Sequence, residues 1–332
     1  MGFPVLPCRK WTSIRRYSKI LLSENFDAPC FKVLARNDTA SASGHQGGMV
    51  IPKAIEAFFP DLTDPLNAAR PTRDVELTAE LWIDSQFRDI VRTRYQHQTW
   101  GNTRSPERRL TGNLALLRRE GKAGDIVTFE RNLEIENYYR ISLVRSETEL
   151  HRNYTTEAVN RRSGAIGQSP VSNLEMRAAV ERVQLSINND FSLFVNAIER
   201  TESRVRKIAR EAAFRKVVLN AYNFACSVSN RKIFDPVGAH GLDAAHIVPL
   251  SRQGTNDVRN GIALSKELHW AFDRGLIGFT NGRVCISRNA RSIEQNNYLL
   301  QFEGMKYRLP DVAANQPHVE ALDWHLSNIF QQ

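Results

Sequence analysis

Residues 242–279 concentrate side chains that could perform acid–base and metal chemistry. His246 lies in an apolar run, Asn260 precedes a glycine, and His269 lies four residues before Asp273. An imidazole with an unperturbed pKa of about 6.5 can accept a proton from water at neutral pH. Histidine and aspartate four residues apart on a helix share one face and can bind one cation together. A base beside a bound cation can hydrolyse a phosphodiester.

A strand, a loop and a helix are needed to position these side chains. The apolar run 244–248 predicts a strand that carries His246 and stops at Pro249. A polar loop follows, and Asn260 then leads into a predicted helix that bears the second histidine and ends at Gly275. A histidine in an apolar strand is more often a core residue than a catalyst, so each of these residues taken alone also has a purely structural interpretation.

Taken together, the motifs AAHIVP, NGIAL and HWAFDRGL resemble those of the HNH nucleases, with the resemblance spanning residues 214–279. The resemblance implies two short strands and a helix that grip one divalent metal ion, for which Mg²⁺ is the expected occupant. His246 would be the general base of phosphodiester hydrolysis. Asn260 would brace the loop and hold the His246 ring in its working orientation, and His269 would be a metal ligand.

The second metal ligand is left open between two aspartates. Many HNH enzymes place an aspartate or histidine ligand directly before the base, where this chain has Ala245. Strand alternation puts Asp243 on the same side as that position, which makes it one candidate. Asp273 on the helix is the other and is favoured, although it could instead brace the turn at Gly275.

Two amino-terminal segments carry polar side chains in a pattern that suits DNA recognition. Residues 35–53 contain NDT, GHQ and IPK, and residues 94–113 contain RLT. Arginines in a loop can bond to guanine edges or phosphates, and glutamate can accept from a cytosine amino group. These segments resemble the two recognition arms of the amino-terminal effector domain of EcoRII-type restriction endonucleases, a DNA-binding pseudobarrel. The resemblance assigns base or backbone contacts to His45, Gln46, Asn102, Arg104, Glu107, Arg108 and Arg109.

Composition narrows the class of protein. The chain has 332 residues, enough for two domains at about 150 residues each. Its 45 basic and 36 acidic side chains give a net charge of +9, which favours a polyanionic partner. Uninterrupted apolar windows of about 18 residues are missing, so no membrane association is expected. Four cysteines without a CxxC pair, and an amino terminus that does not read as a secretory signal, predict a prokaryotic cytoplasmic protein.

The pattern of apolar residues divides the chain. The first half predicts short strands at residues 31–34, 48–51, 75–83, 90–95, 114–117, 125–130 and 138–144, and one short helix at 54–59. Apolar residues recur at three- and four-residue intervals from Ser172 to Ile198, which predicts helices. The expected fold is α+β, with a β-pseudobarrel at 1–160, a helical linker or dimerisation segment at 161–205 and a ββα-metal nuclease domain at 206–332.

A basic helix is predicted just before the nuclease motif. It contains Arg204, Arg206, Lys207, Arg210, Arg215 and Lys216. These side chains could follow DNA phosphates by charge neutralisation. A solvated helix face is the equal alternative, because Glu202 and Glu211 can pair with part of that charge.

The resulting hypothesis is a type II, sequence-specific endonuclease that acts on double-stranded DNA. Because a single HNH site cuts one strand, a homodimer is expected, with the apolar helices at 174–198 as its surface. A cognate DNA methyltransferase would be a separate protein of the same system. Two alternatives stay open, namely an endonuclease directed by methylcytosine and a DNA-binding regulator with an inactive nuclease domain.

Overall fold

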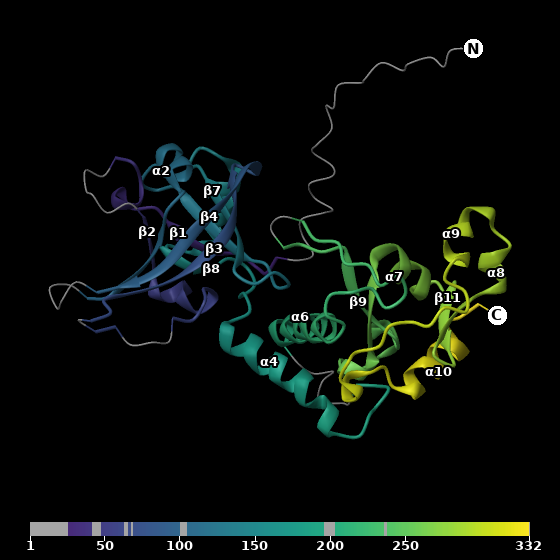
Figure 1. Cartoon of the computed structure of the whole chain (residues 1–332). Helices are drawn as coiled ribbons and strands as arrows, with labels where there is room; N and C mark the ends of the chain where they lie inside the picture. Colours follow the sequence, from purple (N-terminus) through teal and green to yellow (C-terminus); the bar gives the residue numbers. More distant parts are fainter. Residues whose placement is uncertain are drawn as a thin grey trace, which may run out of the picture.

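The computed structural model describes residues 26–41, 48–62, 66–67, 69–99, 105–195, 203–235 and 238–331. Figure 1 shows a large curled sheet at the amino-terminal end and mostly helical structure in the carboxy-terminal half. We refer to residues 26–165 as the sheet region and to residues 171–331 as the carboxy-terminal region. Buried apolar clusters lie in both regions, one with Tyr95 and Phe129 in the sheet region and one with Phe214 and Phe272 in the carboxy-terminal region. The structure therefore confirms the predicted α+β class.

Eight strands of the described chain form one sheet in the order β2-β5-β4-β3-β7-β6-β1-β8. Their bounds are β1 Cys30–Val33, β2 Met49–Ile51, β3 Thr72–Ile83, β4 Gln86–Gln98, β5 Glu107–Thr111, β6 Ile126–Arg131, β7 Tyr138–Val144 and β8 Ser163–Ala165. Neighbours are antiparallel except β3 and β7, which are parallel. The register pairs Met49 with Leu110 and Gln98 with Glu107, so the segments that precede β2 and β5 leave from opposite ends of β5.

Short helices cover the sheet region. They are η1 Arg36–Asp38, η2 Lys53–Phe58, α2 Ala115–Glu120 and α3 Glu149–Ala158. The prediction of a strand at residues 114–117 is wrong, because Leu114 is the N-cap of α2 and the next three residues belong to that helix. Leu114 and Leu117, three residues apart, are both buried, while the neighbouring Arg118 donates to the carbonyl oxygens of Asp38 and Thr39. The helix predicted at 54–59 forms, but as the tighter 3₁₀ type.

Helix α4, Asn173–Leu185, joins the two regions (Figure 1). A capping box of Ser172 and Glu175 begins it. Arg131 of β6 binds the side chain of Asn173, and Ala179 and Val183 are buried in the carboxy-terminal cluster. Much of the apolar face proposed for dimerisation is therefore used within the chain.

The helical pattern predicted up to residue 198 is only partly correct. After α4 the chain forms η3 Ser186–Asn188 and then an irregular segment in which Phe194 pairs with Gly254. Residues 196–202, including Ile198, lie outside the described residues. The long helix α6, Arg204–Ala221, follows and packs along α4.

The carboxy-terminal region holds the candidate motif on a hairpin and a helix. Strand β9, Leu242–His246, pairs antiparallel with β10, Gly261–Ser265, and α7, Lys266–Asp273, follows. Further elements are η4 Leu250–Arg252, η5 Val258–Asn260, β11 Ile277–Thr280, β12 Arg283–Ile286, α8 Arg288–Arg291, η6 Glu294–Asn296, α9 Asn297–Leu300, η7 Ala313–Asn315 and α10 Val319–Asn328. The expectation that Asn260 leads directly into a helix is corrected, because β10 lies between them.

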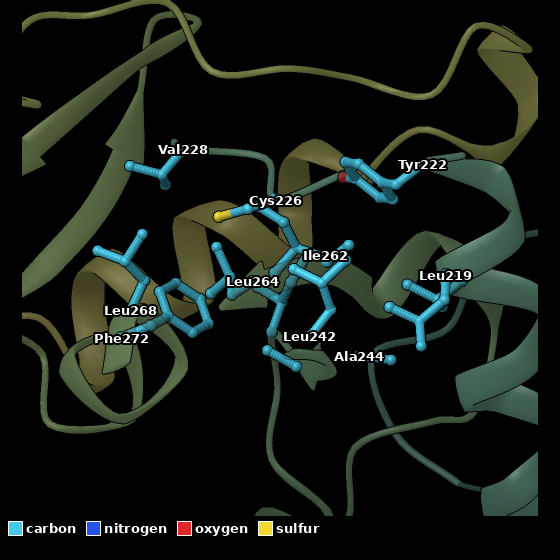
Figure 2. Packing of buried hydrophobic residues seen from close by; sticks show 14 of the residues in the cluster. Leu219, Tyr222, Cys226, Val228, Leu242, Ala244, Ile262, Leu264, Leu268 and Phe272 are labelled. Carbon is cyan, nitrogen blue, oxygen red and sulfur yellow. The ribbon is translucent and has the colours of Figure 1, made fainter. Parts of the chain in front are cut away.

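Two glycines allow this hairpin and helix to pack closely. A Cβ atom at Gly261 would lie 2.4 Å from a methyl carbon of Val218 in α6. Gly275, with φ of +68°, ends α7 where a Cβ would lie 2.0 Å from the carbonyl oxygen of Ile329. Figure 2 shows the core between these elements, with Leu219 of α6 and Leu268 of α7 near the β9–β10 hairpin. Among the described helices, none combines the length and apolarity that a membrane span needs.

Candidate active site

The ring of His246 is held at the end of β9 by two contacts. It stacks on Phe214 of α6 with ring centroids 3.8 Å apart, and its Nε2 lies 3.0 Å from Oδ1 of Asn256. An amide oxygen can only accept, so Nε2 carries the hydrogen and Nδ1 keeps its lone pair. Burial lowers the pKa of His246 to about 4, against the opposing effect of the bond to Asn256. The imidazole is therefore neutral at pH 7 and able to accept a proton.

Asn260 holds the loop rather than the histidine ring. Its side chain is fully buried, with Oδ1 accepting from Val248 N at 2.8 Å and Nδ2 donating to the carbonyl oxygens of Val248 and Thr255. These bonds brace the loop that leaves β9, as the resemblance implied. The expected orientation of the His246 ring by Asn260 is corrected, because Asn256 makes that contact.

Asn256 was missed by the sequence analysis. It is 6% exposed, although it lies in a polar loop, and its Nδ2 is buried without a hydrogen-bond partner. In the sequence it is one of several loop residues with polar side chains, and its spacing from His246 has no helical or strand period. Only the path of the loop brings the two side chains together.

His269 lies between the two candidate aspartates. Its Nδ1 is 3.1 Å from Oδ2 of Asp243 in β9, and its Nε2 is 3.4 Å from Oδ2 of Asp273 in α7. Burial favours the neutral ring, but the bond to Asp243 and the charge of Asp273 outweigh it and raise the pKa of His269. Burial alone would raise the pKa of Asp243, but the bond to His269 and the nearby positive charges together lower it. Burial dominates at Asp273, whose pKa is raised.

The side chains around His269 are of types that bind divalent ions. Within the described ranges, no three histidine, cysteine, aspartate or glutamate side chains are placed to hold a metal ion by themselves. A histidine fixed by a carboxylate at one ring nitrogen, with the other nitrogen beside a second carboxylate, is nevertheless a common form of metal ligand. Mg²⁺ takes few protein ligands and completes its shell with water and phosphate oxygens. The donor types therefore fit an ion held jointly with substrate.

The candidate DNA contacts in the sheet region are placed differently from their prediction. Glu107, Arg108 and Arg109 belong to strand β5 and not to a loop. Arg109 bonds to Glu107 at 2.6 Å, while Arg108 lies 3.4 Å from both Tyr95 Oη and a carboxylate oxygen of Glu56. His45, Gln46, Asn102 and Arg104 lie outside the described residues. The three described side chains are thus engaged within the sheet region.

The basic face of α6 is not uniformly solvated. Arg210 is only 8% exposed and borders a cavity of about 320 Å³ beside Asn256. Lys207 pairs with Glu211 at 3.9 Å on the helix surface. Arg215 forms an ion pair with Glu134 of the sheet region. The helix therefore contains both a solvated pair and buried positive charge.

Comparison with known proteins identifies the carboxy-terminal motif. Residues 226–280 match the HNH endonuclease family model, so the chain carries an HNH endonuclease domain there and the predicted nuclease motif is confirmed. No curated protein matches the chain.

Two solved structures show a distant likeness. One is the modification dependent TagI restriction endonuclease, with 21% identity and a TM-score of 0.29 over 35% of this chain and 37% of that one. The other is the B3 domain of the UbaLAI restriction endonuclease with cognate DNA, with 20% identity and a TM-score of 0.29 over 44% of this chain and 84% of that one. The first likeness thus spans little more than a third of the TagI chain.

Proposed function

We propose that this protein is a type II restriction endonuclease that cuts double-stranded DNA at a specific sequence. The observation that carries the proposal is a neutral, half-buried His246 in the same hairpin and helix unit as the Asp243–His269–Asp273 cluster, inside an HNH endonuclease domain. Phosphodiester hydrolysis needs a base that is unprotonated at pH 7 and side chains that can bind a metal ion.

In the proposed mechanism, Nδ1 of His246 accepts a proton from a water molecule as the water oxygen bonds to phosphorus. The bond from phosphorus to the 3′ oxygen breaks, and that oxygen leaves in line and takes a proton from solvent water, giving 5′-phosphate and 3′-hydroxyl ends. Asn256 fixes the tautomer of His246 through its bond to Nε2. Asn260 keeps the loop in place, so it acts on the reaction through position.

His269 and Asp273 are proposed to hold the divalent ion, with Asp243 orienting His269 through Nδ1 or joining as a further ligand. Mg²⁺ bound there would neutralise charge on the scissile phosphate and the leaving oxygen. The two aspartates face different nitrogens of the His269 ring. Asp243→Asn and Asp273→Asn should therefore change the Mg²⁺ concentration needed for activity by different amounts.

Target recognition is assigned to the sheet region, proposed as a pseudobarrel of the EcoRII effector type within residues 1–160. The resemblance of the two arm segments supports this assignment, and the net charge of +9 of the whole chain suits a polyanionic partner. The proposed contacts are His45, Gln46, Asn102, Arg104, Glu107, Arg108 and Arg109. We further propose a homodimer that cuts both strands, a cognate methyltransferase in the same system, and the cytoplasm of a prokaryote as the setting.

The test uses purified protein and its His246→Ala variant on unmethylated and cytosine-methylated plasmid, each with Mg²⁺ or with chelator. Discrete fragments from unmethylated DNA that require Mg²⁺ and disappear in the variant would support the proposal. Fragments from methylated DNA alone would replace it with modification-directed cleavage. An absence of cutting from both substrates, with specific binding retained, would favour the regulator.

A further inference from the structure

Arg215 of α6 is next in sequence to a residue that contacts the candidate active site. It directly follows Phe214, the residue on which His246 stacks. It also borders a cavity of about 360 Å³ together with His240, which lies just before β9. Its positive charge acts on the ionisation of Asp243, of His246 and of His269. A guanidinium group within electrostatic range of all three is well placed to bind a DNA phosphate, because its planar fork matches two phosphate oxygens.

The carboxylate of Glu134, from the sheet region, holds this guanidinium. Glu134 lies in the turn between β6 and β7 and forms an ion pair with Arg215, with side-chain exposures of 13% and 37% respectively. The turn is built to present it, because Oδ1 of Asn132 accepts hydrogen bonds from the backbone nitrogens of Glu134 and Ile135 at 2.9 and 2.8 Å. The contact therefore joins an ordered turn to an ordered helix.

We propose that Arg215 is a phosphate-binding residue of the nuclease site and that Glu134 occupies it until DNA takes its place. The inference rests on the proposed nuclease function. A carboxylate and a phosphate compete for the same donors, so DNA can bind Arg215 only when the turn releases it. Release of Arg215 by Glu134 therefore couples DNA binding by the sheet region to completion of the nuclease site in the carboxy-terminal region.

The same cavity supplies a matched control. Glu136 lies in the same turn and borders the same cavity, also near Lys216. Glu134→Gln and Glu136→Gln each remove one negative charge from this turn with little change in shape. A general effect of charge on DNA attraction would therefore appear in both variants, whereas release of Arg215 would appear in the first alone.

The experiment has a binding arm and a cleavage arm. In the binding arm, a short fluorescein-labelled duplex of random sequence is titrated without metal in a His246→Ala background, and anisotropy gives Kd. We expect Glu134→Gln to bind about threefold to tenfold more tightly and Glu136→Gln to be nearly unchanged, since charge-assisted contacts outweigh screened surface charge. Adding Arg215→Ala should cancel the gain, because the two residues are coupled.

In the cleavage arm, single-turnover rates are measured with Mg²⁺ and saturating cognate plasmid. Arg215→Ala should lower the rate constant by about 100-fold, as for removal of one donor that stabilises developing charge. Arg215→Lys should restore only part of it. An equal gain in both glutamine variants, a gain that survives Arg215→Ala, or an unchanged rate in Arg215→Ala would overturn the proposal. A wild-type protein that does not cut would defeat the nuclease function, while the binding arm would still decide the masking of Arg215.

Discussion

The carboxy-terminal hairpin and the amino-terminal sheet hold their candidate functional residues in different ways. In the hairpin and helix, which pack on a shared core, Asp243 bonds to His269, and His246 bonds to Asn256. In the sheet, Arg108 and Arg109 lie on β5 and bond to neighbouring glutamates. Chemistry needs preset distances, which a packed core supplies, whereas recognition residues can exchange internal partners for DNA on binding.

The largest expected difference concerns the two histidines of the carboxy-terminal region that stack on phenylalanine rings. His246 stacks on Phe214, and His325 stacks on Phe272 with ring centroids also 3.8 Å apart. His246→Ala should lower the single-turnover cleavage rate by about 1,000-fold, which is typical for loss of a general base. Specific DNA binding should stay unchanged. His325→Ala, the matched control, should lower the free energy of unfolding and leave the rate of the folded fraction near wild type. Equal rates in the two variants would remove His246 from the mechanism.

A second expected difference separates two asparagines of the same loop. Asn260→Ala deletes a buried side chain that bonds to the backbone of Val248 and Thr255, so it should lower the free energy of unfolding by about 2–4 kcal/mol. Asn256→Ala should cost less stability but lower the cleavage rate by about tenfold, since only the orientation of His246 is lost. Denaturant unfolding and single-turnover kinetics would measure the two effects. The division of roles fails if both variants lose stability and rate in the same proportion.

Substitution in the sheet region should affect binding instead of the rate. Arg108→Ala should weaken binding to the recognised sequence by about 1–3 kcal/mol if the side chain contacts a base. Arg92→Ala is the control, because this arginine on neighbouring β4 is 74% exposed and its pair with Glu76 is a surface contact. Binding to cognate and random duplexes would be compared by anisotropy. A loss of the same size on both duplexes would instead make Arg108 a phosphate contact.

The smallest expected effect is an opposite response of the two regions to acid. Burial lowers the pKa of His246 and of His325 to about 4, so their contribution to stability is complete above about pH 6.5 and is lost as the pH falls toward 4. Burial raises the pKa of Asp27 in the sheet region to about 6, so its contribution is complete below about pH 4 and is lost as the pH rises through 6.

Hydrogen exchange at pH 4.5 and pH 7 should therefore show a less protected carboxy-terminal region in acid. At its junction with α4, where Asp27 accepts from Val171 N, the sheet region should be more protected in acid, by about 2 kcal/mol. Asp27→Asn should flatten the response of the sheet region and leave that of the other region unchanged. A uniform loss of protection in acid across both regions would contradict the opposing signs.

Much of the nuclease motif could be predicted because its signals are local. The apolar run before Pro249 predicted a strand, and β9 forms there. The four-residue spacing of His269 and Asp273 predicted a helix, and α7 forms there. The β-rich first half and the start of α4 after Ser172 were also predictable from period alone. With the resemblance to HNH nucleases, these signals led to the HNH domain now found at residues 226–280 and to a proposed general base with two candidate carboxylates.

Tertiary structure decided which side chains contact one another in the site. Asn256 meets His246 through the path of a loop, and Phe214 meets it from a helix some thirty residues earlier in the chain. The hairpin register puts Asp243 on one nitrogen of His269 and α7 puts Asp273 at the other. Likewise, only the sheet shows that Glu107 and Arg109 form a pair on β5, and only the packing of two regions brings Glu134 to Arg215. The spacing of apolar residues along a helix or strand specifies which of its faces is buried, but not which distant element covers that face.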